Sequence, residues 1–419
     1  MPALAVFVLM YHPSLFGMNV LHLLGIVAWV TVLLRPAQVV KAVEIRALLR
    51  VFAHVGVLFL YLFLVTLWNL SDGAPLLTLA FWLTSVLPVC VLLTMHFKSH
   101  SYAEHHVFTL LLIGGTLQGL TALAAFLNEP IQKVFLSTLG GVEHFELLVG
   151  IMGYRVFGYA ADLTFTTSIL QGLLAALSVR LAVFHGKRFL VYTPLLVFSA
   201  AINARIGLIT FLIGLMLLAL PLYLQNVRIL IRLMVSLMLL IAAMLLIVPI
   251  VARHTPDTYA WIQKGFEEIA IAWTFGQEGN HRFSYFNYFT SPTRWTLPGG
   301  TRNFFGAGTW VLGGSKYGVA SDIGYINDVW VGGIVYATGL YLLFANMIIG
   351  LSRRGVGRRH IGFLKMFFAV VFLMANIKGP VFVTNSLTSA FFLIYVFYAL
   401  GKQGARVAGD FNVTTGVLP

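Results

Sequence analysis

The sequence predicts an all-α membrane protein that crosses the bilayer many times. Of its 419 residues, 59% are hydrophobic and only 10% carry a charge, whereas soluble domains carry about 25% charged residues. Apolar segments close to the ~20 residues needed to cross a bilayer follow one another along most of the chain. Short basic connectors separate them, and one long polar stretch interrupts them. These features exclude a soluble globular protein.

We predict about eleven spans, or twelve if the apolar residues 2–12 also enter the membrane. Pro13 interrupts the first apolar run, and residues 2–12 are shorter than a crossing helix requires. The predicted spans are residues 15–34, 50–69, 75–95, 107–127, 164–184, 188–204, 206–225, 229–251, 326–350, 361–377 and 381–400.

The basic residues predict the orientation, because cytoplasmic loops of membrane proteins are enriched in Lys and Arg. One side then holds most of the 27 Lys and Arg but only three of the 14 acids, Glu44, Glu104 and Asp410. We assign that side to the cytoplasm, which places the N-terminus outside and the C-terminus inside. The net charge of +13 therefore reflects topology, and we expect no nucleic-acid partner. The basic connectors are residues 35–50, 96–106, 185–188, 225–232, 353–360 and 401–406.

This orientation divides the chain into three parts. Residues 1–251 hold the first eight spans and an outer loop at 128–163. Residues 252–325 form a large extracytoplasmic loop, and residues 326–419 hold the last three spans and a cytoplasmic tail. The large loop is too long for a simple connector and too aromatic to be disordered. We therefore expect the function to reside in it.

Motifs for metals and cofactors are missing from the sequence. It has no GxxxxGK[ST] phosphate loop, no HExxH, no paired CxxC and no DxD-type carboxylate pair. The single cysteine, Cys90, excludes an intramolecular disulfide. We expect no metal and no cofactor.

Basic side chains on the outer side are candidates for binding an anionic substrate. The planar guanidinium of arginine matches the oxygens of a phosphate group, and sugar rings can stack on neighbouring aromatic faces. Two other interpretations stay open: Arg205 could extend to lipid headgroups, and the others could be surface charges paired with acids. The candidates are Arg155, Arg205, Arg282, Arg294, Arg302 and Lys316.

Asp322 is the candidate general base, because a carboxylate beside the membrane surface and basic side chains could accept a proton. It could instead cap the N-terminus of the following helix. His281 is the next candidate base, and His254 is another titratable group in the loop. For Asp328 we expect a place in the first helical turn, where the helix dipole favours an acid.

Three short stretches give the sequence a resemblance to a known family. They are INARIGLI (202–209), NFFGAGTW (303–310) and DIGYIN (322–327), the last followed by VGGIVYATGLY. The chain resembles the Wzy-type repeat-unit polymerases and the similar O-antigen ligases, polytopic glycosyltransferases that use polyprenyl-diphosphate donors without a metal. Ligases usually carry a histidine where this chain has Asp322, which favours a polymerase. The resemblance adds Gly306, Gly308, Tyr325 and Asn327 to the substrate-binding candidates.

The resemblance implies an enzyme of the bacterial inner membrane with its active site on the periplasmic side. It would transfer a growing glycan from undecaprenyl diphosphate to the next lipid-linked repeat unit, and a chain-length regulator is an expected partner. Because diphosphate is a good leaving group, arginines would suffice to neutralise it, and a single displacement would invert the anomeric centre. The alternatives are an O-antigen ligase acting on lipid A core, or a lipid-linked oligosaccharide flippase or other transporter.

Overall fold

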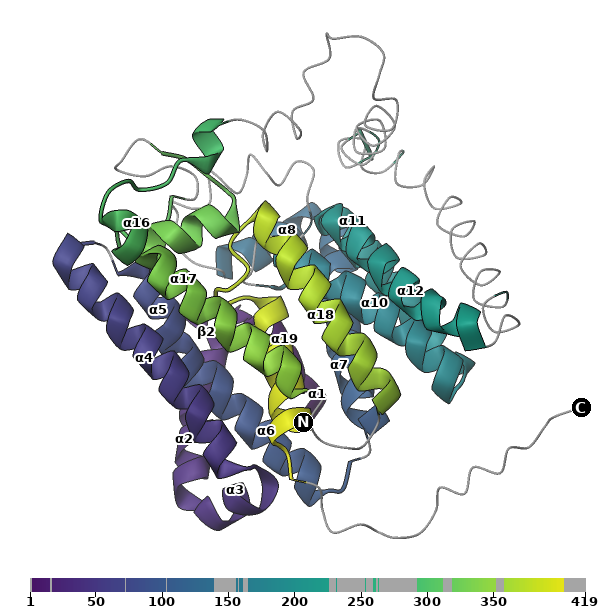
Figure 1. Ribbon diagram of the computed structural model, residues 1–419. Helices are drawn as coiled ribbons and strands as arrows, with labels where there is room; N and C mark the ends of the chain where they lie inside the picture. The colour runs from purple at the N-terminus through teal and green to yellow at the C-terminus, as the bar shows by residue number, and fades with distance from the viewer. Residues whose placement is uncertain are drawn as a thin grey trace, which may run out of the picture.

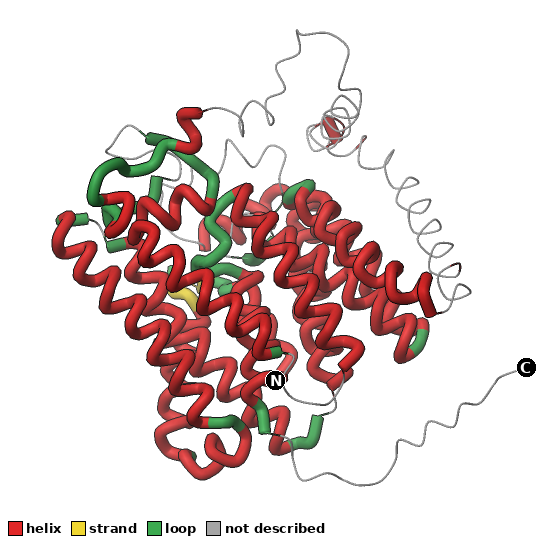
Figure 2. The backbone as a smooth tube through the Cα atoms, viewed as in Figure 1, coloured by secondary structure: helices red, strands yellow, loops and turns green. Residues whose placement is uncertain are grey.

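The computed structural model of the protein is almost entirely helical in the part that it describes (Figures 1 and 2). Its described strands are β1 (Ser14–Leu15) and β2 (Met18–Asn19), which pair antiparallel. The described residues are 2–15, 17–71, 73–102, 104–138, 156, 158–160, 165–225, 231, 253, 259–260, 263, 292–311, 319–351 and 358–402.

The N-terminal part begins with a short buried helix rather than a span. Helix α1 (Pro2–Tyr11) is too short to cross a bilayer and packs against α7 and α19. The β1–β2 hairpin reverses the chain into α2 (Val20–Leu34), whose first turn is capped by the Asn19 side chain. Helix α3 (Pro36–Ala42) then turns away from α2 by 97°, at the proline that begins it.

Long apolar helices form the body of the bundle. The helices that carry Gly172 and Gly207 pack unusually closely: a Cβ at Gly172 would lie 2.1 Å from the carbonyl oxygen of Gly207. Small residues that let helix backbones approach are typical of membrane helix pairs. The helices are α4 (Ile45–Asn69), α5 (Ala74–Phe81), α6 (Leu87–Ser99), α7 (Glu104–Leu127), α8 (Glu129–Thr138), α10 (Phe165–His185), α11 (Thr193–Asn203) and α12 (Ile206–Gln225). A π-helical turn joins α5 to α6, and a 3-10 turn precedes α11.

The C-terminal part contributes helices α16 (Arg302–Phe305), α17 (Gly324–Gly350), α18 (Arg358–Lys378) and α19 (Ser386–Tyr395). Helix α17 is broken at Gly332 and Gly333, whose backbone angles are not helical. We call residues 324–331 the short half of α17 and residues 334–350 the long half. In Figure 1 the short half runs beside α16 at one end of the bundle, whereas the long half runs along the bundle beside α4.

The structure supports a multi-pass membrane protein, but it does not confirm eleven or twelve spans. Among the described residues, six helices are long and apolar enough to cross a membrane, or seven if the bent pair α2–α3 is one span. The predicted spans 188–204 and 381–400 correspond to shorter helices, because turns and non-helical residues interrupt these apolar runs. The predicted span 206–225 has the same bounds as helix α12. The predicted span 229–251 lies outside the described residues.

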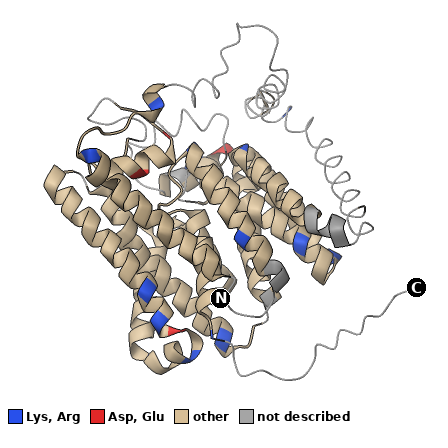
Figure 3. Cartoon of the chain, viewed as in Figure 1, with Lys and Arg blue, Asp and Glu red and all other residues tan. Residues whose placement is uncertain are grey.

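The packing matches a bundle in lipid. Aromatic side chains fill the interior around Phe344, whose ring lies 4.7 Å from that of Phe382 and 5.2 Å from that of Phe372. Exposed apolar side chains line the outward face of α4, including Phe63 and Leu67. The coloured charged residues in Figure 3 lie mostly toward the ends of the helices. Because water-exposed helices carry polar outer faces, the apolar outer face of α4 indicates contact with lipid.

Candidate functional site

The candidate residues that the structure describes fall into two groups. Arg205 and Asp322 belong to segments near the N-terminal end of α10, and Arg294 is hydrogen-bonded to the residues before Asp322. Arg302, Gly306 and Gly308 lie between the C-terminal end of α4 and the break in α17. In Figure 1 the start of α17 and α16 lie at the same end of the bundle.

Arg294 is anchored to the segment that leads into α17. Its guanidinium donates a hydrogen bond to the carbonyl of Ala320 (2.8 Å), and its own carbonyl accepts one from the Ser321 hydroxyl (2.7 Å). Ser321 is fully buried and also accepts a hydrogen bond from the amide of Ile323 (3.3 Å). These contacts attach Arg294 to Ala320 and Ser321, the two residues directly before Asp322.

Asp322 is half-buried and directly precedes the capping residue of α17. The residue at the N-cap position is Ile323, whose side chain makes no cap hydrogen bond. The carbonyl oxygen of Asp322 lies beside Gly379, which in turn packs against the ring of Phe165 at the start of α10. The loop that carries the candidate base therefore lies against the first turn of α10.

Arg205 lies in the tight turn between α11 and α12 and is half-buried. The Ser168 hydroxyl, one turn after Phe165 on α10, donates to the carbonyls of Ala200 (2.8 Å) and Ala204. This fixes the turn of Arg205 against the same end of α10 that the Asp322 loop contacts. The fold thus brings the turn of Arg205 and the loop of Asp322, distant in sequence, near the first turns of α10.

Arg302 lines an open pocket of about 840 Å³ at the end of α4. Its walls combine an arginine with aromatic and apolar side chains, and Trp68 is 89% exposed beside it. Such a surface suits a ligand with an anionic group and an apolar or sugar face. The lining residues are Tyr61, Leu64, Val65, Trp68, Asn69, Gly299, Gly300, Thr301, Arg302, Phe305 and Gly306.

The turn Gly306–Ala307–Gly308 (the GAG turn) packs with Gly306 against the break in α17 and with Gly308 against Ser71. Gly306 has a φ of 81°, and a Cβ there would lie 2.5 Å from the Cα of Gly332. The amides of Ala307 and Gly308 donate to the carbonyls of Trp330 (2.7 Å) and Val331 (3.0 Å). The turn therefore satisfies carbonyls that the broken helix leaves unpaired, a structural role that the sequence analysis did not foresee.

Tyr325 and Asn327 make hydrogen bonds within the fold. The Tyr325 hydroxyl donates to the carbonyl of Leu373 (2.8 Å). The buried Asn327 amide donates to the carbonyls of Ser321 (2.8 Å) and Ile323 (3.0 Å), and its oxygen accepts from the amide of Val311 (3.0 Å). These bonds account for both side chains, and substrate contact by either stays a prediction.

Asp328 is a residue whose importance the sequence analysis underestimated. It is only 3% exposed, and its carboxylate accepts hydrogen bonds from the Tyr341 hydroxyl (2.7 Å) and the Asn376 amide (3.0 Å). The available signal was an acidic residue within an apolar span, since such residues are costly in a membrane and usually functional.

Four candidates lie outside the described residues: Arg155, His281, Arg282 and Lys316. His254 lies outside them as well. For the part of the chain that is described, no group of three or more His, Cys, Asp or Glu side chains could hold a metal ion.

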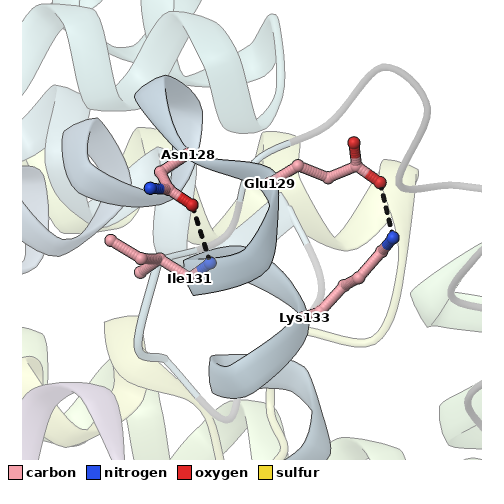
Figure 4. Close-up of polar contacts among 4 residues, drawn as sticks. All are labelled: Asn128, Glu129, Ile131 and Lys133. Atoms are coloured by element: carbon pink, nitrogen blue, oxygen red, sulfur yellow. Dashed lines mark hydrogen bonds and ion pairs between the residues drawn. The ribbon is translucent and has the colours of Figure 1, made fainter.

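An ion pair marks the outer segment that follows α7. Lys133 lies 2.7 Å from the carboxylate of Glu129, one turn earlier on α8 (Figure 4). The hydrogen bond from Lys133, together with its positive charge, lowers the pKa of Glu129. Both side chains are largely exposed, so the pair contributes little to stability. Lys133 thus provides a basic residue outside both candidate groups.

Comparison with protein-family models, curated proteins and solved structures finds no match.

Proposed function

We propose that the protein is a membrane glycosyltransferase that polymerises oligosaccharide repeat units carried on undecaprenyl diphosphate, at the extracytoplasmic face of the inner membrane. What supports the proposal is that the turn of Arg205 and the loop of Asp322 both lie near the first turns of α10, and that Arg294 is hydrogen-bonded to the residues directly before Asp322. Two phosphate-binding groups and one carboxylate are the functional groups that such a transfer requires. The stretches that hold Arg205 and Asp322 resemble those of the repeat-unit polymerases.

In the proposed reaction a hydroxyl oxygen of the acceptor sugar attacks the anomeric carbon of the donor glycan. The bond between that carbon and the diphosphate oxygen breaks, and its electron pair leaves with the lipid diphosphate. Arg205 and Arg294 stabilise the developing negative charge through charge-assisted hydrogen bonds. Asp322 accepts the proton of the attacking hydroxyl. One displacement inverts the configuration at the anomeric carbon.

The pocket that Arg302 lines, beside the break in α17, also supports the proposal. The pocket offers a guanidinium for phosphate and the aromatic faces of Tyr61, Trp68 and Phe305 for sugar rings or an isoprenoid chain. A lipid-linked glycan combines these three kinds of surface in one molecule.

The direct test is glycan analysis of a strain that lacks the protein. A polymerase requires that only single repeat units remain on the cell surface after deletion, and that the intact gene restores long chains. Long lipid-linked polymer that is not transferred to its final acceptor would instead indicate a ligase. Absence of repeat units on the extracytoplasmic face, with accumulation inside, would indicate a flippase.

A further inference from the structure

Asp328 is a buried carboxylate to which the proposed reaction assigns no role. It lies in the short half of α17 with 3% of its surface exposed. Removing a carboxylate from water is costly unless hydrogen bonds compensate it, and more so in a spanning segment. Its presence therefore requires a specific explanation.

Two neutral donors from different segments converge on one oxygen of this carboxylate. The Tyr341 hydroxyl, from the long half of α17, donates to Oδ2 over 2.7 Å, and the Asn376 amide of α18 donates over 3.0 Å. The same amide lies 3.4 Å from the Tyr341 hydroxyl oxygen. Asp328 thus connects the two halves of the broken helix to each other and to α18.

Asn376 also contacts the first residue of α17 and the loop before α19. A Cβ at Gly324, the first residue of α17, would lie 2.1 Å from the Asn376 side-chain oxygen. That oxygen also accepts a hydrogen bond from the amide of Val381 (3.1 Å), in the loop before α19. The start of the short half is therefore packed directly against a partner of Asp328.

The short half needs such contacts because helix continuity does not hold it. The break at Gly332 and Gly333 interrupts the backbone hydrogen bonds that would otherwise fix its direction. The outer loop holds one side, where the Trp330 indole donates to the carbonyl of Thr296 (2.9 Å). On the opposite side the contacts are those of Asp328 and the hydrogen bond from Tyr325 to α18.

We infer that Asp328 is a positioning residue: its hydrogen bonds to Tyr341 and Asn376 fix the short half of α17, and thereby hold Asp322 in place for the transfer reaction. Asp322 lies two residues before the short half and six before Asp328, on the segment to which Arg294 is anchored. The inference rests on the proposed function for its catalytic part. The placement of the short half is independent of that function.

The first measurement is a distance between spin labels in purified full-length protein. Labels at Ala320→Cys and Met366→Cys, with Cys90→Ala, report the position of the Asp322 segment relative to α18. We expect Asp328→Leu to broaden the distance distribution, because leucine accepts no hydrogen bond. Asp328→Asn should keep it narrow, since the amide oxygen can accept from both donors. Thr94→Val is the matched control: it removes a buried hydroxyl that has no hydrogen-bond partner within the described structure.

The second measurement is turnover of lipid-linked donor by the same variants. We expect Asp328→Leu to lower kcat about a hundredfold with KM for the donor nearly unchanged, because a small misplacement of a catalytic group costs that much. Asp328→Asn should retain turnover within about tenfold, because hydrogen bonds to a neutral acceptor are roughly half as strong. If Asp328→Leu does not fold, Tyr341→Phe removes one of the two donors and should broaden the distribution to a smaller extent.

Three results would overturn the inference. A narrow distance distribution in folded Asp328→Leu would show that other contacts suffice. Unchanged turnover with a broadened distribution would show that the position of the Asp322 segment does not affect the reaction. Loss of turnover in Asp328→Asn with a narrow distribution would mean that Asp328 transfers a proton itself. If the unaltered protein forms no polymer but Asp328→Leu broadens the distribution, the placement by Asp328 stands and the proposed function fails.

Discussion

At the scale of single residues, the fold separates candidates that share a residue type. The turn of Arg205 and the loop of Asp322 lie near the first turns of α10, Arg294 is bonded to the residues before Asp322, and Arg302 lines a separate pocket. Gly306 and Gly308 have backbone roles beside the break in α17. The predictions at this scale therefore concern Arg205 and Asp322, whose chemistry differs.

Arg205→Lys keeps the charge but loses the planar group that can bind two phosphate oxygens at once. We expect weaker donor binding and slower transfer, by about a hundredfold or about 3 kcal/mol in the barrier, as for the loss of one donor to a developing anion. Steady-state kinetics with lipid-linked donor measure both effects. Lys133→Gln, which alters an exposed lysine on α8, is the control and should leave both constants unchanged. Equal kinetics for Arg205→Lys and the unaltered protein would remove Arg205 from the site.

Asp322→Asn removes the proposed base and keeps the size of the side chain. We expect kcat to fall by about 10²–10⁴-fold, the usual contribution of general base catalysis, while the affinity for the donor stays close to that of the unaltered protein. Binding and turnover measured on one preparation separate the two quantities. Near-normal turnover in folded Asp322→Asn would make His281 the next base to test.

At the scale of secondary-structure elements, the break in α17 is a joint between the long half of α17 and the loop at 299–308. The amides of Ala307 and Gly308 and the Tyr61 hydroxyl donate to three consecutive carbonyls from Trp330 to Gly332. A free carbonyl in a membrane helix costs free energy unless it finds a donor. The break and the GAG turn are therefore stable only together.

Replacing Gly333 by alanine tests this joint. Gly333 has a φ of 70°, and a Cβ there would lie 2.0 Å from the carbonyl oxygen of Phe304. We expect the left-handed strain alone to cost about 1–3 kcal/mol, with a lower unfolding temperature in detergent. Gly56→Ala is the matched control, because a Cβ there meets no atom within 4 Å. It lies within α4 and should stabilise the helix by about 0.5–1 kcal/mol. Equal effects of the two substitutions on the unfolding temperature would contradict this role of Gly333 in the joint.

Tyr61→Phe tests the same joint from α4. The Tyr61 hydroxyl donates to the carbonyls of Gly332 (2.9 Å) and Phe305 (3.3 Å). Its removal should destabilise the protein by about 1 kcal/mol, the usual net value of a hydrogen bond. Faster proteolysis of the loop at 299–306 would be the structural sign, because that loop would lose its attachment to α4. Unaltered stability and proteolysis would show that the amides of the GAG turn suffice.

At the scale of the whole molecule, the bundle separates an apolar middle from charged ends (Figure 3). The proposed chemistry lies at the end that carries α16 and the start of α17. The reaction requires this end to be extracytoplasmic, because the proposed donor is polymerised on that face.

Reporter fusions test the orientation. A reporter that is active only outside the cytoplasm should be active when fused at residue 299 and inactive at residues 100 and 187. The physical reason is the excess of Lys and Arg predicted for the cytoplasmic connectors. The reverse pattern would place both candidate groups on the cytoplasmic face and would contradict the proposed function.

The sequence by itself determined the class of the molecule. Apolar runs separated by basic connectors suffice to predict a multi-pass helical protein, because the bilayer requires long apolar helices. Residue chemistry also sufficed to nominate Arg205, Arg294 and Asp322, although nothing in the spacing shows that the segments of Arg205 and Asp322 approach the same end of α10. The number of spans was not determined, because an apolar run does not show how much of it is one continuous helix, as the short helices α1 and α19 illustrate.

Only the tertiary structure decided what holds each group. The roles of Gly306 and Gly333 depend on an atom of a distant segment that lies where a Cβ would be. Asp328 was expected in the first helical turn, where the helix dipole favours an acid, yet its partners Tyr341 and Asn376 lie 13 and 48 residues away. A carboxylate in an apolar run signals that a compensating partner exists. Which partner it is depends on how the helices pack, and a single sequence does not encode that in any local pattern.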